Sequence, residues 1–481
     1  MTVQQMAGVD AGFLYLETPT LHMHTLKVAV IDPSGVPGGY TPANLRALLA
    51  ATLPSLPGFR RRLVRVPLEM THPVWIEDPD FDLDRHVRFV RAPAPGDQAA
   101  LCRVVGDMAA DQLPQDRPLW EMVVVEGLEG GRIGIAVKIH HALADGGAAV
   151  AMLNNVLTAE PGSAPSGEDD WVPDPMPTRW KLTRMALHGV MMRIVLFPVV
   201  MWRALRGRVQ ILWRRVRGIR RRAALFRTPP TPWNGSLTTH RVFATARLPL
   251  GDLKAVRRAT GVSVNDVFLA VCAGALRSYL QAHGIATDAP LVSSVPVGTD
   301  RRGDAAAPRL VGNKLSTIFS LLPTNEADPL ERVRIVHETT KGEKAELAIK
   351  GESMLEELAE YRPPKLTSWA MRTYSRHRLA DRHRAPINLV TSNVPGPREP
   401  LQIGGAKLVE IYSVGPILEG IGLNVTGWSY VDTLYLGLVA CPEAIPDLDH
   451  MGTLFEAALV ELVEAVSDDR EHALEGDARP A

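Results

Sequence analysis

The segment from His140 to Gly146, HHALADG in one-letter code, constrains the fold of this chain more than any other. Apolar residues alternate at positions 133, 135, 137 and 139 just before it, and strict alternation predicts a buried β-strand. The stretch from Gly146 to Leu153 is typical of the start of a helix, with Asp145 near the N-cap. The segment therefore predicts a strand, a tight turn and a helix in direct succession.

His141 is the candidate general base in this turn. Side chains of a strand alternate between its two faces, so His141 continues the apolar face while His140 points the other way with Lys138. An imidazole pKa of about 6.5 lets a histidine take a proton from an alcohol or thiol near neutral pH. Strand, turn and helix hold Asp145 close to this ring. The candidate catalytic residues are His141, Asp145, His140 and Gly146.

Two other kinds of site fit these residues less well. His140 and Asp145 also satisfy HxxxxD, the signature of glycerol-phosphate acyltransferases, but the sequence has no downstream phosphate-binding block of the Phe-Pro-Glu-Gly type. A zinc site needs HExxH or paired Cys and His at metal spacing, whereas Cys102, Cys272 and Cys441 are isolated and adjacent strand histidines diverge. We therefore expect no metal. The sequence also has no GxSxG elbow and no phosphate-binding GxxxxGK[ST] loop.

Composition indicates an ordinary globular protein of the cytoplasm. A chain of 481 residues is long enough for two or three domains, and its 46% hydrophobic and 22% charged residues are typical of soluble proteins. Three scattered cysteines fit a reducing compartment. Residues 1–10 lack the basic and apolar regions of a secretory signal, so we expect a cytoplasmic location.

A cationic segment between Lys181 and Arg227 is the second informative feature. It holds 13 of the 53 Lys and Arg residues and no Asp or Glu, although the formal net charge of the chain is +0. Apolar residues recur from Trp202 to Ala223 at intervals of three and four, which predicts one amphipathic helix. The apolar run from Ile194 to Trp202 has nine residues and is too short to cross a bilayer, which takes about 20.

A basic amphipathic helix beside a short apolar run is typical of an anchor in the membrane interface. A crossover helix packed on the protein, with its arginines in water, is an alternative that does not exclude the first. Nucleic-acid binding is a third interpretation, which we do not favour. The residues expected to contact the membrane are Trp202, Leu205, Val209, Leu212, Arg214 and Arg215.

The chain divides into four regions. Residues 1–160 form the N-terminal half with the two histidines, and residues 161–233 form a linker and the cationic helix. Residues 234–468 form the C-terminal half, and residues 469–481 a charged tail. Strand-like and helix-like segments alternate in both halves, so we expect two α/β halves. The expected strands lie at 26–30, 120–127, 133–140, 241–248, 291–297, 314–322, 388–394 and 434–440, and the expected helices at 42–53, 99–112, 250–259, 261–279 and 451–466.

Several motifs resemble those of one family, in the same order. HHxxxDG at residues 140–146 matches the signature of the condensation superfamily, the chloramphenicol-acetyltransferase-like acyltransferases. The remaining motifs resemble the bacterial wax ester synthase/diacylglycerol acyltransferases of actinobacterial type, over nearly the whole chain. These motifs are Asp10 to Glu17 with Met23-His24, Pro118-Leu119-Trp120, Asn265-Asp266-Val267, Val295-Pro296-Val297 (followed by Gly298 where the family usually has a small hydroxyl residue), Gly312-Asn313 and Ser392 to Pro397.

The resemblance implies two chloramphenicol-acetyltransferase-like α/β sandwich halves with the active-site tunnel between them. It implies that His141 is the base and that Asp145 is mainly structural, usually engaged with an arginine. Acyl-CoA would be the co-substrate without a further cofactor, and diacylglycerol or a long-chain alcohol the acceptor. Asn265 and Ser392 are candidates for the oxyanion donors. The expected substrate-binding residues are Asn265, Ser392, Asn393, Pro118, Leu119 and Trp120.

Each of these motifs also has a plain structural interpretation. Pro118-Leu119-Trp120 can simply begin a buried strand, and either Asn265 or Asp266 can cap a helix. Two rival functions remain: a condensation enzyme that uses another thioester donor, and a non-catalytic lipid-binding or scaffold protein with the same fold. Because diacylglycerol is nearly insoluble in water, we expect peripheral attachment to the inner face of the membrane or to lipid droplets.

Overall fold

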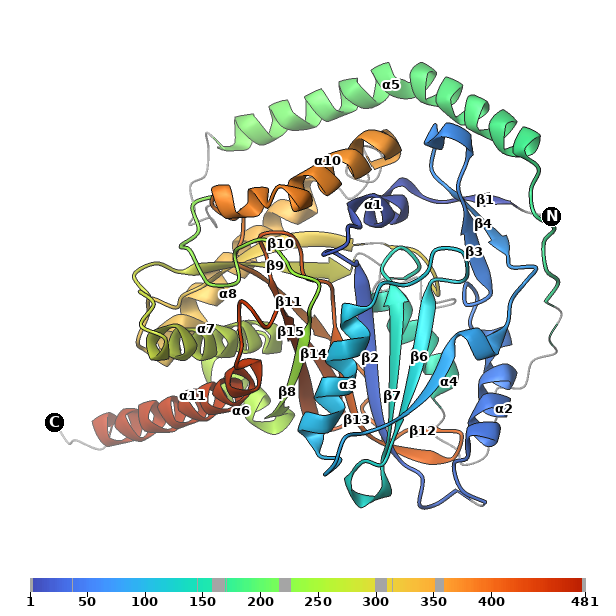
Figure 1. Ribbon diagram of the computed structural model, residues 1–481. Coiled ribbons are helices and arrows are strands. Elements are labelled where there is room, and N and C mark those ends of the chain that lie inside the picture. Colours follow the sequence, from blue (N-terminus) through green and yellow to red (C-terminus); the bar gives the residue numbers. More distant parts are fainter. Residues whose placement is uncertain are drawn as a thin grey trace.

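The chain forms two lobes, each built on a mixed six-stranded sheet (Figure 1). The structure is a computed structural model that describes residues 3–36, 38–144, 146–157, 169, 171–215, 226–298, 309–313, 315–350 and 359–477. The predicted α/β architecture of two lobes is confirmed.

The N-terminal lobe has the strand order β12-β13-β2-β7-β6-β5. Helix α3 covers one face of this sheet, and helices α2 and α4 cover the other (Figure 1). A smaller sheet of order β1-β4-β3 lies beside it. The elements are β1 (Gln4–Gln5), α1 (Gly8–Leu16), β2 (His24–Asp32), α2 (Pro42–Thr52), β3 (Arg61–Val64), β4 (Val74–Glu77), β5 (Val87–Arg91), α3 (Gln98–Ala110), β6 (Trp120–Glu126), β7 (Ile133–His140), α4 (Gly146–Val156), β12 (Gln402–Ile403) and β13 (Ala406–Val414).

The C-terminal lobe has the strand order β10-β9-β11-β14-β15-β8. Helices α7, α8 and α11 pack on one another and on this sheet around a second apolar core. The elements are β8 (Val242–Pro249), α6 (Leu250–Thr260), α7 (Val264–Ala282), β9 (Leu291–Gly298), β10 (Leu315–Leu322), α8 (Pro329–Lys350), α10 (Pro364–Arg376), β11 (Leu389–Val394), β14 (Leu423–Tyr430), β15 (Thr433–Ala440) and α11 (Leu448–Asp477).

The division into an N-terminal and a C-terminal half is wrong for one segment. Strands β12 and β13 come from the C-terminal half of the chain but complete the sheet of the N-terminal lobe. β13 pairs antiparallel with β2, and Ile411 stands opposite Ala29 in a register that buries both side chains. β2 would otherwise be an open edge with unpaired backbone groups, which a compact fold covers. Strand pairing between distant segments cannot be seen in local composition.

Two predicted boundaries in the C-terminal half need correction. Neither Asn265 nor Asp266 is the N-cap of α7: Ser263 occupies this position and accepts a hydrogen bond from the Asp266 backbone, while the Asp266 carboxylate accepts one from Ser263 N–H. This reciprocal capping box satisfies two helix donors at once. The charged tail expected after residue 468 instead continues α11 to Asp477, because it contains good helix formers and no Pro before that point.

The cationic helix starts earlier than predicted. Helix α5 (Arg179–Arg215) is one helix of 37 residues and includes the apolar run and Pro198. Its stretch Arg179–Trp202 is long and apolar enough to cross a membrane by length and composition, since 18 consecutive residues within it have a mean hydropathy of 1.7. The prediction that this segment is too short to cross a bilayer therefore holds for the nine-residue apolar run, but not for the helix that contains it. Residues 216–223 of the predicted helix lie outside the described part, as do the side chains of Leu205, Val209, Leu212, Arg214 and Arg215.

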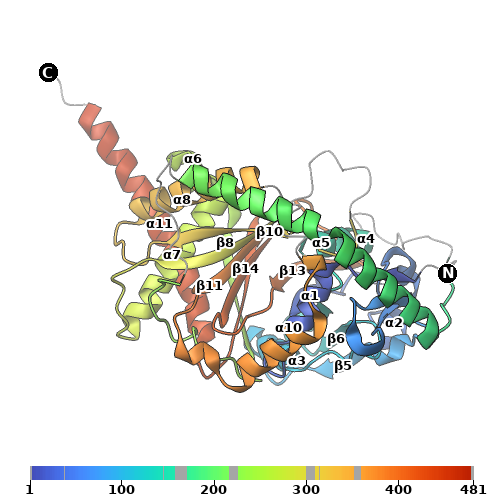
Figure 2. The same cartoon turned by 90° about the horizontal axis from the view of Figure 1, so that it is seen from above.

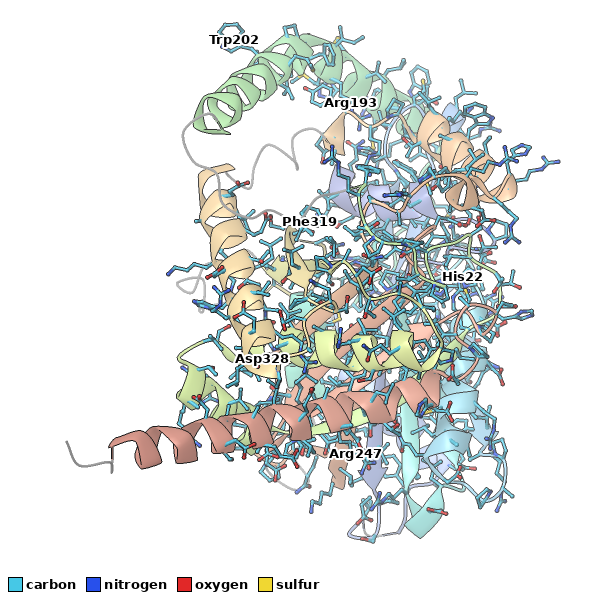
Figure 3. The ribbon with its side chains drawn as sticks, turned by 90° about the vertical axis from the view of Figure 1, so that its left-hand side faces the viewer. His22, Arg193, Trp202, Arg247, Phe319 and Asp328 are labelled. Carbon is cyan, nitrogen blue, oxygen red and sulfur yellow. The ribbon has the colours of Figure 1, made fainter. Side chains whose placement is uncertain are left out.

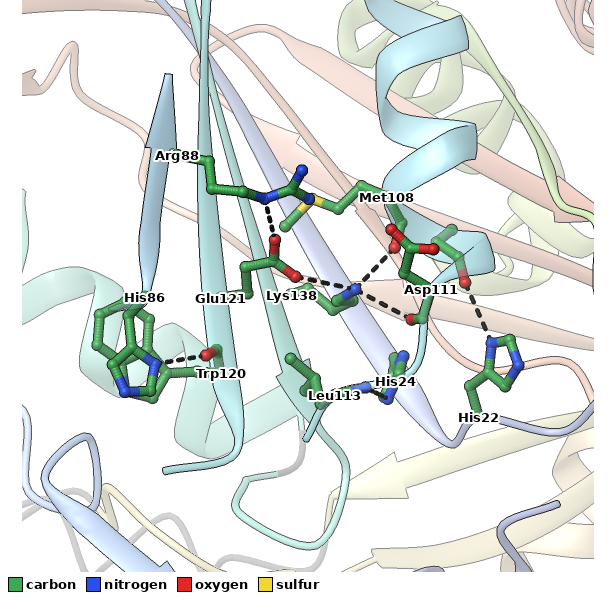
Figure 4. A network of polar contacts seen from close by, with 11 residues as sticks. His22, His24, His86, Arg88, Met108, Asp111, Leu113, Trp120, Glu121 and Lys138 are labelled. Carbon is green, nitrogen blue, oxygen red and sulfur yellow. Dashed lines mark hydrogen bonds and ion pairs between the residues drawn. The ribbon is translucent and has the colours of Figure 1, made fainter. Parts of the chain in front are cut away.

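The two faces of β7 have different chemistry. On the face that carries His140, the buried Lys138 Nζ donates to the carbonyl oxygens of Met108 at 2.8 Å and Asp111 at 3.0 Å. The same ammonium lies 3.1 Å from a carboxylate oxygen of Glu121 (Figure 4). A buried charge is tolerated only when it is paired and hydrogen-bonded, so this network fixes α3 against the strand. The opposite face of β7 is apolar.

Buried histidines make this fold sensitive to acid. Burial lowers the pKa of His140 to about 3 and that of His72 to about 4, and it holds the pKa of His24 well below its usual value. The unfolded chain, with histidine pKa values of about 6.5, therefore binds more protons than the folded chain in mildly acidic solution. The contribution of these histidines to stability is fully present above about pH 6.5 and is lost as the pH falls from there toward 3 to 4. Urea denaturation at about pH 7 and about pH 5 measures this loss.

The variant His24→Phe removes one of these groups and is expected to reduce the dependence of the unfolding free energy on pH. The exposed His377 offers a matched control, because His377→Phe removes no buried titratable group. Equal pH slopes for the wild type and His24→Phe would contradict the assignment of the acid sensitivity to these buried rings.

Candidate active site

The turn that follows β7 is held from both halves of the chain. His141 N–H donates to the Met23 carbonyl at 2.8 Å, next to the start of β2. Gly312 N–H, from the C-terminal half, donates to the Leu143 carbonyl at 2.8 Å, and Ala144 forms a β-bridge with Gly312. The backbone of residues 141–144 is therefore fixed between the two lobes, where the tunnel was expected.

The His141 ring has a partner on each of two sides. Its Nδ1 lies 2.8 Å from Oδ1 of Asn313. Its face stacks on Phe13 of α1, with ring centroids 4.2 Å apart and an interplanar angle of 19°. The residue is half-buried, so the ring is not sealed in the core.

Asn313 decides which ring nitrogen of His141 carries the proton. The Asn313 amide nitrogen donates to Asp10 Oδ1 at 2.7 Å and to the His141 carbonyl at 2.8 Å. These two acceptors fix the orientation of the amide, because only its nitrogen can donate to them. Its oxygen then faces His141 Nδ1 as an acceptor. The neutral ring therefore carries its proton on Nδ1 and its lone pair on Nε2, which is the arrangement that a general base needs.

Asp10 supports Asn313 from the buried side of α1. Its side chain is buried, and its second carboxylate oxygen lies against Gly312. A Cβ atom at Gly312 would lie 3.3 Å from that oxygen, and the φ angle of this residue is +81°. Both the close approach and the left-handed backbone favour glycine here. The motif Gly312-Asn313 thus has a physical reason: glycine lets the amide of Asn313 reach both Asp10 and His141.

His140 has a different environment from His141. It lies on the α3 face of β7, is fully buried, and its Nδ1 accepts a hydrogen bond from Ala142 N–H at 3.0 Å. Burial, and to a lesser extent the neighbouring His141, lowers the pKa of His140 to about 3. His140 is therefore neutral near pH 7 and stabilises the turn through its ring. We infer a structural role for His140 rather than a part in proton transfer.

The other predicted catalytic residues are placed only in part. Asp145 lies outside the described residues, and α4 begins at Gly146. The predicted substrate-binding residues Pro118, Leu119 and Trp120 are all buried at the start of β6.

Trp120 is an anchor of the core. Its Nε1 donates to the Phe59 carbonyl at 2.7 Å, and its ring stacks on His86 at 4.5 Å. We infer that Pro118, Leu119 and Trp120 position the strand rather than contact substrate.

The C-terminal lobe supplies the remaining candidates. Asn265 is half-buried in the first turn of α7, and Ser392 and Asn393 are half-buried on β11. Their contact with substrate stays a prediction. Asp266, next to Asn265, accepts hydrogen bonds from Thr340 and His337 of α8 and so joins two helices.

Three residues around His141 were not predicted as site residues. Phe13, Asp10 and Asn313 belong to the motifs Asp10 to Glu17 and Gly312-Asn313, which carry part of the family resemblance. The sequence did contain a sign of such a role: both motifs place polar residues outside the strands and helices that the sequence predicts. Nothing in the sequence spacing shows that residues 10, 141 and 313 meet.

Comparison with known proteins gives the family. The model described as wax ester synthase/diacylglycerol acyltransferase catalytic domain matches residues 6–268, and the model described as WS/DGAT C-terminal domain matches residues 311–463. A putative diacylglycerol O-acyltransferase of Mycobacterium tuberculosis is 34% identical over 477 residues, covering 98% of this chain and 92% of that protein. A second from the same organism is 38% identical over 449 residues, covering 92% of each chain.

Solved structures agree with this assignment. The wax ester synthase/diacylglycerol acyltransferase of Marinobacter aquaeolei VT8 is 28% identical, with a TM-score of 0.66 over 96% of this chain and all of that one. The first condensation domain of the calcium-dependent antibiotic synthetase is 16% identical, with a TM-score of 0.55 over 97% of this chain and 96% of that one, and shares the fold. The two matched family models and the curated relatives together place this chain in the wax ester synthase/diacylglycerol acyltransferase family.

Proposed function

We propose that this protein transfers an acyl group from an acyl-CoA thioester to the hydroxyl group of diacylglycerol or of a long-chain alcohol, with His141 as the general base. Membership of the family supports the acyl transfer. The observation that supports the role of His141 is the hydrogen bond from its Nδ1 to Asn313, which leaves the Nε2 lone pair as the basic site.

The reaction needs one proton to move twice. Nε2 of His141 takes the proton of the acceptor hydroxyl while that oxygen attacks the thioester carbonyl carbon. The tetrahedral intermediate then collapses, the C–S bond breaks, and the imidazolium returns the proton to the leaving thiolate. No covalent acyl-enzyme is required, because the thioester is already activated. Asn265 and Ser392 are proposed hydrogen-bond donors to the oxyanion.

Asn313 and Asp10 position the base in this mechanism. A neutral amide next to Nδ1 orients the ring without adding a negative charge against it, and the Asp10 carboxylate accepts a hydrogen bond from this amide. Phe13 holds the ring plane from the side. Asp145 is expected to fix the same turn, as the family signature implies.

We further propose that the protein docks on a membrane or lipid-droplet surface through α5. This helix exposes large apolar side chains, among them Trp180, Ile194, Val195, Phe197 and Trp202, and Figure 3 shows Trp202 on its outer side. Large apolar side chains that are exposed next to one another mark interaction sites. Residues Lys181 to Arg227 carry no acidic residue, which favours anionic headgroups.

Several contacts favour a helix lying in the interface over one that crosses the bilayer. α5 runs across the top of both lobes (Figures 1 and 2). Its first turns pack on the protein, with Leu182 and Ala186 buried against Val66 and Val74. Further along, the Phe197 ring lies 5.8 Å from that of Tyr361. Crossing the membrane would break these contacts.

Helix α10 adds a second exposed face on the same side of the molecule (Figure 2). Leu366 and Trp369 are 59% and 64% exposed, next to the exposed cations Lys365 and Arg372. α10 packs on α1, which carries Phe13 and Asp10. A membrane contacted by α5 and α10 would therefore lie on the side of α1 from which a lipid acceptor could approach His141.

Replacement of His141 by alanine tests the chemistry. Loss of the general base should lower kcat by about 10²–10⁴-fold without preventing folding, since the ring is half-buried. The measurement is esterification of dioleoylglycerol and of hexadecanol with radiolabelled oleoyl-CoA. Equal product from wild type and His141→Ala would remove His141 from the mechanism and favour a different function for this fold. Activity restricted to carrier-protein thioesters would favour the condensation alternative.

Asn313→Ala tests the positioning of the base. It should lower kcat about tenfold, because one hydrogen bond of about 1.4 kcal/mol no longer favours the reactive ring orientation. KM for acyl-CoA should stay unchanged, because Asn313 is proposed to hold the ring and not the substrate. A change in KM alone, with kcat intact, would show that Asn313 binds substrate instead.

Removing apolar contact area from α5 tests the docking surface. The triple variant Ile194→Ser, Val195→Ser and Trp202→Ser should no longer sediment with phosphatidylglycerol vesicles, because it loses buried apolar area at the interface. Activity on a soluble, short-chain alcohol should persist. The exposed Val460 on α11 provides the control Val460→Ser, which should sediment like the wild type. Unchanged sedimentation of the triple variant would reject α5 as the anchor.

A further inference from the structure

An apolar cavity lies in the N-terminal lobe between the sheet and helices α2 and α4. Its volume is about 110 Å³, which is large against the roughly 10–15 Å³ that a single water needs. The proposed role of His141 does not explain this cavity. The strands contribute Ala29, Met122, Ile135, Val137, Ile139, Ile403 and Ile411, α2 contributes Leu45, Leu48 and Leu49, and α4 contributes Ala149, Met152, Leu153 and Val156.

The cavity lies on the face of the sheet that leads to His141. Ile135, Val137 and Ile139 alternate along β7 and all line it. His141 is the next residue of the same parity, directly after the strand. The lining of β7 therefore starts at Ile139, two residues from the proposed base, and continues for about 13 Å from there to Ile135, at about 3.3 Å per residue.

The incomplete burial of side chains on the central strands shows that this space is not filled by the protein. β2 and β7 are the middle strands of the sheet and are covered by helices on both faces. Nevertheless Val137 and its cross-strand partner Lys27 are only half-buried. Leu48 and Leu153 on the covering helices are also half-buried. Side chains in the middle of a packed layer reach solvent only when space next to them is unfilled.

The polar groups of the lining are bonded to the protein. Lys27 Nζ donates to Ser413 Oγ at 2.5 Å and lies 5.2 Å from the centroid of the Trp428 ring. Thr52 Oγ1 donates to the Leu48 carbonyl at 2.7 Å. The rest of the lining is hydrocarbon and sulfur. A cavity of this kind favours an alkyl chain and disfavours a glycerol, nucleotide or phosphate group, whose polar atoms would lose their hydrogen bonds with water.

We propose that this cavity binds the hydrocarbon tail of the acyl donor, with the thioester at His141 and the chain running along β7 toward Ile135. The proposal rests on the acyl transfer proposed above. A cavity of about 110 Å³ suits the donor, which has one chain, better than diacylglycerol, which has two. The flexible side chains of Met122 and Met152 can move aside to lengthen the space for a long chain.

Positions along helix α4 correspond to different depths in the cavity. It starts just after the turn of His141 and runs back along the sheet, so Ala149 lines the near end and Val156 the far end of the cavity. These two residues are seven positions apart, which is about 10 Å along a helix. A bulky side chain at Ala149 should therefore stop the chain near the thioester, and one at Val156 should stop only longer chains.

The experiment compares Ala149→Phe and Val156→Phe with acetyl-, hexanoyl-, decanoyl- and palmitoyl-CoA at a fixed alcohol acceptor. We expect Ala149→Phe to retain acetyl transfer and to lose kcat/KM for decanoyl- and palmitoyl-CoA by about tenfold or more. Val156→Phe should lose only palmitoyl transfer to that extent. The control is Ala47→Phe, at an exposed position of α2 whose neighbour Leu48 lines the cavity.

Each outcome decides between defined alternatives. Uniform loss over all four donors, with an unchanged thermal melting curve, would overturn the cavity as a chain site. A shift in the preferred length of the alcohol instead of the donor would assign the cavity to the acceptor and also overturn the proposal. Absence of product from the wild type with every donor would instead reject the acyl transfer itself. Should Ala149→Phe not fold, Leu153→Trp, at a half-buried lining position, repeats the test between the two depths.

Discussion

The amide of Asn313 is the interaction on which the proposed site depends. It joins three distant parts of the chain: Asp10 on α1, the backbone and ring of His141 after β7, and its own segment in the C-terminal half. Two donated hydrogen bonds fix the direction of the third, so the tautomer of the neutral His141 ring follows from the packing of the two lobes. A side chain that can both donate and accept is required, and a carboxylate or a hydrocarbon at this position could not replace it.

Local sequence patterns predicted the elements well, because alternation and helical spacing reflect the burial of each segment. The strand before His141, the turn and the helix from Gly146 are confirmed, and so is the separation of His140 and His141 onto opposite faces. Asn313 and Phe13 could not be predicted as partners of His141, because both contacts join segments that are far apart in the sequence. Asn313 comes from the C-terminal half of the chain, and Phe13 lies on α1. The membership of β13 in the first sheet depends equally on long-range pairing. The start of α5 was missed because the unbroken apolar run from Ile194 to Trp202 has no polar face and so shows no helical period.

Strand β7 connects the parts of the N-terminal lobe to which we assign functions. β7 presents its apolar face to α2, α4 and the cavity, its polar face to α3, and its end to the base. Helix α1 joins the base to the surface, since it stacks Phe13 on His141 and packs under α10. A donor chain inside the lobe and an acceptor arriving at the lipid surface would thus meet at the turn from different directions.

The pairing of β13 with β2 also affects how the chain is made. During synthesis, β2 emerges early and cannot find its neighbour until residues 406–414 have left the ribosome. Until then the N-terminal sheet has an open edge of mostly apolar residues, the kind of surface through which unfinished chains associate with one another. Separate expression of the two halves would leave that edge permanently uncovered. The N-terminal lobe is therefore complete only when both halves of the chain are present.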